Sequence, residues 1–128
     1  MLMAEVLFVI PNSSVAAYQD LAKTYSAIEP PTWALLLAGA VRKNSHDPEI
    51  LDCDAERLSL DQSLKRIDDS NATLIVFVLY GQNPNSGTTS MIGAVKLAKA
   101  VKNAGIKTPI CFCGSHTHAL PREVLALD

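Results

Sequence analysis

Apolar and polar positions along the chain predict strands and helices that alternate. The continuous apolar runs at Glu5–Ile10 and Thr73–Leu79 are typical of strands buried on both faces of a parallel sheet. A shorter run at Glu49–Asp52 and an apolar run at Thr108–Cys113 predict two more strands. A helical pattern follows each of these four strands, so the sequence predicts four successive strand–helix units.

The segments between the strands carry helical periodicity with start and stop signals. Pro30-Pro31 opens a helix over Thr32–Lys43 that is apolar on almost every side, and we therefore expect it to be largely buried. The other expected helices are a short one capped by Ser13 or Ser14 within Ser13–Glu29, one opened by the capping box Ser59–Gln62, one from Thr88 or Thr89 to Gly105, and one from Pro121 to Leu127.

This order predicts an α/β fold of the Rossmann-like or flavodoxin-like type, a parallel sheet with helices on both faces. The natural strand order is 2-1-3-4, and a fifth strand would complete it. We expect residues 1–128 to form a single domain that is the N-terminal part of a longer enzyme. Strand four would otherwise be an open edge, which proteins rarely leave uncovered, so we also consider a partner that covers it.

Composition narrows the class of partner and the compartment. Apolar residues make up 48% of the chain and charged residues 19%, and the net charge is −2. Without a basic block or a long apolar run, nucleic acid and membrane are poor candidates as partners. Three cysteines do not make a disulfide framework, and the N-terminus lacks a secretion signal, so we expect a cytoplasmic protein.

Candidate chemistry lies in the loops that follow the strands, because ligands of parallel α/β sheets bind at the carboxyl edge. These loops are Pro11–Ser14, Tyr80–Thr88 and Gly114–Leu120. None carries a G-x-G-x-x-G fingerprint, a Walker lysine or a serine elbow. The sequence therefore predicts a binding role and no catalytic residues of its own.

Some residues leave two interpretations open. Cys111, Cys113, His116 and His118 are zinc-ligand types within eight positions, but buried cysteines also serve as small apolar side chains, and we favour that interpretation. Trp33 is expected as a core anchor, with a ligand-stacking role left open.

Two blocks of the sequence resemble the N-terminal cobalamin-binding domain of cobalamin-dependent radical S-adenosylmethionine (SAM) enzymes. The first begins at Pro30–Leu35 and continues through Glu49–Asp52 to Ser59. The second, Gly114–Pro121, is similar to the G-G-x-H-x-T/S-x-x-P turn of that family. This sequence departs from the family at Cys113, which replaces a glycine, at His118, which replaces threonine or serine, and at Trp33, where a small residue is frequent.

The resemblance implies a sheet that holds cobalamin across its carboxyl edge, with the nucleotide tail beside the sheet. It implies base-off cobalamin without a protein histidine on cobalt, because the D-x-H-x-x-G element is absent. The C-x3-C-x2-C motif is also absent, so a [4Fe-4S] cluster and SAM would belong to a catalytic radical SAM domain outside these residues, with methyl transfer or a related radical reaction as its chemistry. The expected cofactor-binding residues are Asn12, Ser13, Ser14, Tyr80, Gly81, Gln82, Asn83, Thr88, Gly114, Ser115, His116 and Thr117.

Two alternatives from other classes stand beside this hypothesis. One is a flavodoxin-like interaction domain that has lost its cofactor and docks a partner at its open edge. The other is a small zinc site at the turn after strand four. Corrin binding separates the first hypothesis from the interaction domain, and stoichiometric zinc would select the metal site.

Overall fold

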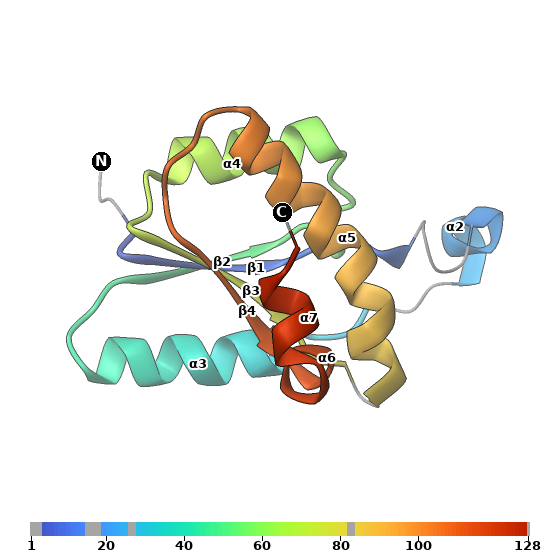
Figure 1. The fold of residues 1–128 in the computed structure, drawn as a ribbon, viewed down its shortest axis with the longest axis horizontal. Helices are drawn as coiled ribbons and strands as arrows, with labels where there is room; N and C mark the ends of the chain where they lie inside the picture. Colours follow the sequence, from blue (N-terminus) through green and yellow to red (C-terminus); the bar gives the residue numbers. More distant parts are fainter. Residues whose placement is uncertain (1–3, 15–18, 26–27, 82–83, 128) are drawn as a thin grey trace.

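The predicted α/β sheet is confirmed: four parallel strands lie in the order β2-β1-β3-β4 (Figure 1). The strands are β1 (Val6–Ile10), β2 (Pro48–Asp52), β3 (Leu74–Leu79) and β4 (Ile110–Gly114). The structure is a computed structural model, and it describes residues 4–14, 19–25, 28–81 and 84–127.

Helices cover both faces of the sheet, as Figure 1 shows. Helices α4 and α5 lie on one face and α3 on the other, while α6 and α7 follow the end of β4. The helical segments are η1 (Gln19–Leu21), α2 (Ala22–Tyr25), α3 (Thr32–Lys43), α4 (Leu60–Ser70), α5 (Pro84–Asn103), α6 (Ser115–Ala119) and α7 (Pro121–Leu125).

Alternate residues of each buried strand enter two separate cores, because successive side chains of a strand point to opposite faces. Val9 and Phe77 pack with α4 and α5 in the larger core. Phe8 and Val78 pack with α3 in the smaller one. Burial on both faces explains why these strands read as continuous apolar runs.

Helix α3 differs from the sequence expectation of a largely buried helix. Ala34 and Ala38 are its buried residues, whereas Trp33, Leu35 and Leu36 are exposed. The helix packs on β1 and β2 through these two alanines, with Leu37 and Val41 partly buried beside them. A uniformly apolar helix cannot show which of its faces meets the sheet.

Two boundaries near the carboxyl edge also differ from expectation. Helix α5 begins at Pro84 rather than at Thr88, because proline fits the first turn of a helix and has no N–H to satisfy there. Thr88 is consequently a helical residue. The turn after β4 contains the one-turn helix α6, and β4 itself extends to Gly114.

The start of α4 agrees with the sequence prediction. Ser59 and Gln62 form the predicted capping box, with reciprocal hydrogen bonds of 3.2 and 2.9 Å.

Exposed His46 lies at the opposite edge of the sheet from the candidate loops, 3.0 Å from the Glu5 carboxylate. The backbone N–H of Asp47 donates to that carboxylate and, together with His46, lowers the pKa of Glu5. Among the described residues, no helix is long and apolar enough to cross a bilayer.

Candidate functional site

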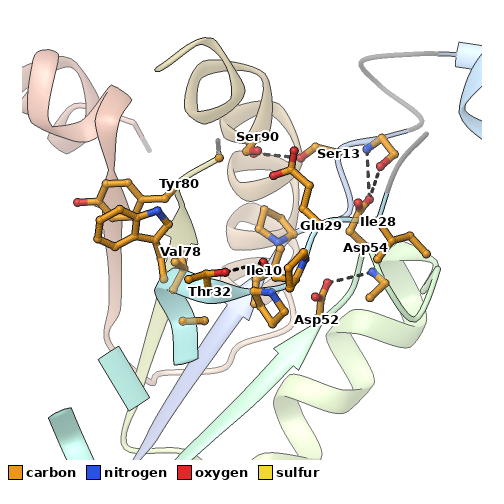
Figure 2. Close-up of a pocket in the computed structure, with 18 of the residues that line it drawn as sticks. Ile10, Ser13, Ile28, Glu29, Thr32, Asp52, Asp54, Val78, Tyr80 and Ser90 are labelled. Carbon is orange, nitrogen blue, oxygen red and sulfur yellow. Dashed lines mark hydrogen bonds between the residues drawn. The ribbon is translucent and has the colours of Figure 1, made fainter. Parts of the chain in front are cut away.

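A cavity of about 350 Å³ opens at the carboxyl ends of β1, β2 and β3 (Figure 2). Its walls come from the loop after β1, the turn after β2, the segment before α3 and the residues that follow β3. Ligand pockets in proteins start at about this size. The lining residues used below are Ser13, Ser14, Glu29, Trp33, Asp52, Asp54, Val78, Tyr80, Gly81 and Ser90.

The loop after β1 is held by side-chain hydrogen bonds to two other elements. The Ser13 hydroxyl donates to the Ser90 carbonyl of α5 at 3.1 Å, and the Ser14 hydroxyl donates to Asp54 Oδ1 at 2.6 Å (Figure 2). Gly93 lets α5 approach this closely, because a Cβ there would lie 2.7 Å from the Asn12 carbonyl oxygen. The two serines expected at the site therefore fix its shape.

Carboxylates give one side of the cavity an acidic character. Asp52 ends β2, and its Oδ1 accepts the N–H of Ala55 at 2.9 Å. The carboxyl of Asp52 is partly removed from water, and this burial raises its pKa. With Asp54 and Glu29, it supplies acceptors for a ligand that carries N–H donors. The acidic residues were missed at the sequence level, although Asp52 directly follows a predicted strand.

Aromatic rings form the opposite side of the cavity. The ring centroids of Trp33 and Tyr80 lie 4.7 Å apart, with an angle of 29° between the planes. Trp33 is 48% exposed, so its interpretation as a core anchor is wrong. Figure 2 shows Tyr80 at the end of the cavity away from Asp52.

Glycines bring the turn after β4 against the end of β3. A Cβ on Gly114 would lie 2.5 Å from the Leu79 carbonyl oxygen, and one on Gly87 would lie 2.8 Å from the same atom. A Cβ on Gly87 would also collide with the Ser115 hydroxyl. Only glycine permits this spacing at both positions, and it sets Ser115 beside the start of α5.

The remaining expected site residues are divided between two places. Thr88 Oγ1 lies 3.2 Å from His116 Nδ1, which joins α5 to α6. Thr117 instead lines a second cavity of about 440 Å³ between α5, β4 and α7, where its buried hydroxyl has no hydrogen-bond partner in the described part of the chain. The Asn12 amide donates to the Leu58 carbonyl at 3.1 Å. Gln82 and Asn83, also expected at the site, lie outside the described residues.

The cysteines and histidines at β4 do not gather as the zinc alternative requires. Cys111 is exposed, whereas the Cys113 thiol lies 3.4 Å from the Phe77 carbonyl oxygen, and burial raises its pKa to about 11. Within residues 4–14, 19–25, 28–81 and 84–127, no group of three or more His, Cys, Asp or Glu side chains is placed to hold a metal ion. The interpretation as a small apolar residue holds for half-buried Cys113 and is wrong for Cys111.

Comparison with known families matches residues 18–128 to the B12-binding domain. The chain belongs to the B12-binding domain family. No curated protein and no solved structure matches it significantly. The parallel sheet with its open carboxyl edge is consistent with this family.

The residues at the carboxyl edge fit a cobalamin. The corrin rim carries neutral amides that donate and accept hydrogen bonds, and the cavity offers carboxylate acceptors and serine hydroxyls. A cobalamin is larger than the cavity, so only part of it would enter while the rest would lie over the edge. The half-exposed rings of Trp33 and Tyr80 offer flat apolar surface to a flat ligand.

Proposed function

We propose that this chain binds base-off cobalamin across the carboxyl edge of the sheet and presents it to a catalytic radical SAM domain. The observation that carries the proposal is the match of residues 18–128 to the B12-binding domain. The 350 Å³ cavity at the carboxyl edge supplies a place for part of the cofactor. When bound, cobalamin supplies a cobalt centre that can accept and release a methyl group. The chain's own part is to bind and orient the cofactor.

The positions of the histidines support a cobalt without a protein ligand. His46 lies at the amino edge beside Glu5, and the loops after β1 and β3 contain no histidine in the sequence. His116 Nδ1 is engaged with Thr88 on α5. His118 is exposed on the one-turn helix α6.

The cofactor residues that we propose stand in two groups around the β3 end. Ser13, Ser14, Tyr80 and Gly81 line the cavity. Gly114 meets the end of β3, Ser115 lies against Gly87 of α5, and Thr88 pairs with His116. The first group would contact the amide rim, since hydroxyl groups both donate and accept hydrogen bonds.

Titration of the purified chain with hydroxocobalamin, followed by desalting, tests the binding. We expect one corrin per chain to be retained, with the absorption shift of the base-off form. Reduction to Co(II) should give an electron paramagnetic resonance spectrum without nitrogen superhyperfine splitting. Nitrogen splitting would overturn the base-off form. A folded chain that retains no corrin would overturn the binding itself and favour the cofactor-free interaction domain.

The position of β4 supports the proposed catalytic partner, whether it is joined to this chain or separate, in the cytoplasm. Among the described residues β4 pairs with β3 alone, and its other edge adjoins the 440 Å³ cavity. Extended segments bind at such edges through main-chain hydrogen bonds. Hydrogen exchange at Ile110–Gly114 should slow when a cobalamin-dependent radical SAM catalytic domain is added. Unchanged exchange at these amides, with the domain shown to bind elsewhere, would contradict docking at β4.

A further inference from the structure

Three carboxylates line the 350 Å³ cavity with no positive side chain beside them. They belong to Glu29, Asp52 and Asp54, which we call the acidic wall, and Figure 2 shows Asp52 and Asp54 on the side away from Tyr80. Among the described residues that line this cavity there is no lysine, arginine or histidine. The ion pairs between described residues include none of the three carboxylates. The acidic wall therefore presents uncompensated negative charge to a ligand.

The protein itself shows the effect of this charge at Asp52. Burial raises the pKa of Asp52, the N–H of Ala55 lowers it, and the negative charges of Asp54 and Glu56 raise it further. The groups that donate hydrogen bonds to the wall, the Ala55 N–H and the Ser14 hydroxyl, are neutral. They orient the carboxylates and leave the charge in place.

This charge discriminates between two kinds of side chain on the rim of a corrin. A cobalamin carries neutral amides there, and each amide has two N–H donors for a carboxylate oxygen. A corrin that carries a carboxylate at the same place has no such donor at neutral pH and brings a like charge. Repulsion between charges in a partly buried site is screened less than in open water.

We propose that the acidic wall selects corrinoids whose rim is fully amidated and rejects those with a carboxylate facing it. The proposal rests on the proposed function and deepens it, because it names the class of corrinoid that this site takes. Glu29 and Asp52 are then specificity-determining residues, which act by repelling the wrong ligand as well as by accepting the right one. One like charge at the wall should weaken binding about tenfold.

Titrations with hydroxocobalamin and with its three monocarboxylic acids, each with one propionamide converted to a carboxylate, test this proposal. We expect at least one of the acids to bind the wild-type chain about tenfold more weakly than hydroxocobalamin, and added salt to reduce the difference. Asp52→Asn should restore most of that loss and leave hydroxocobalamin binding within about twofold, because asparagine keeps the oxygen that accepts the Ala55 N–H. Glu29→Gln should act in the same direction.

Glu49→Gln is the matched control, because Glu49 is exposed on the same strand as Asp52, does not line the cavity and loses the same unit of charge. It should leave all four affinities unchanged, and circular dichroism should show every variant folded. Asp54 is left intact, since its hydrogen bond with Ser14 shapes the loop after β1.

Two results would overturn the proposal while cobalamin binding stands. One is equal affinity of the wild-type chain for hydroxocobalamin and all three acids. The other is a loss of affinity that Asp52→Asn and Glu29→Gln leave unchanged, or that Glu49→Gln relieves equally. Failure of the wild-type chain to retain hydroxocobalamin itself would instead overturn the proposed function, and this proposal with it.

Discussion

Thr88 Oγ1 and His116 Nδ1 lie 3.2 Å apart, although 28 positions separate the two residues in the sequence. Thr88 belongs to the second turn of α5 and His116 to the single turn of α6, so this contact joins the helix after β3 to the turn after β4. Both side chains are expected cofactor residues. Their pairing fixes the spacing between two loops of the carboxyl edge.

We expect Thr88→Val and His116→Ala to lower stability by similar small amounts and to be non-additive. The pair is exposed, so a coupling free energy of about 0.5 kcal/mol is expected. Urea unfolding of both single variants and the double variant measures it. Strict additivity would show that the contact contributes nothing to the fold.

Replacement of Gly114 by alanine should destabilise the fold strongly. The added Cβ would lie 2.5 Å from the Leu79 carbonyl oxygen, so β3 and the turn after β4 would have to separate, at a cost of about 1–3 kcal/mol. The control is Gly39→Ala on exposed α3, where a Cβ meets nothing within 4 Å. That change should stabilise the chain by about 0.8–1 kcal/mol through helix propensity. Thermal unfolding compares them, and a Gly114→Ala variant as stable as wild type would refute the close approach.

The cysteines should react with iodoacetamide in the order of their exposure, Cys111 first. Burial, and then the charge of the neighbouring Cys111 thiolate, raises the pKa of Cys113 from 9.0 to about 11. The Cys113 thiolate fraction at pH 8 is therefore about a hundredfold below that of an ordinary thiol, and it increases as the pH approaches 11. Cys53, which is fully buried, has its pKa raised to about 11 by the same cause and should react last.

Mass spectrometry of peptides after timed labelling at pH 7, 8 and 9 measures these rates. Labelling in denaturant, where all three thiols become accessible, is the control. Cys113 modified as fast as Cys111 at pH 8 would contradict the raised pKa.

The strand order and most boundaries could be predicted from the sequence because strong local signals agree with the fold. The apolar run at Thr73–Leu79 is short, rich in β-branched residues and followed by Tyr80-Gly81, which favours a strand buried in a sheet. The capping box at Ser59 forms from residues three positions apart and needs no tertiary partner. The predicted start of α5, at Thr88 or Thr89, was four or five residues too late, because the first turn of this helix is polar. The helix begins at Pro84, a residue type that is common in the first turn.

The site was predicted only in part, because a loop's chemistry depends on what the other loops place opposite it. Ser13, Ser14 and Tyr80 were expected from their position after strands, and they do line the cavity. Asp54 was missed, since only the turn after β2 brings it within 2.6 Å of the Ser14 hydroxyl. Thr117 was predicted to bind the cofactor at the carboxyl edge of the sheet, but it lines the second cavity.

The sequence by itself determined the alternation of strands and helices, since hydrophobic periodicity and caps act over a few residues. Only the tertiary structure decided that α3 turns its alanines to the sheet and leaves Trp33 beside Tyr80, which are 47 positions apart. Which side of an apolar helix becomes buried depends on the surface it meets. That surface is built by strands distant in the chain, so no local pattern records it.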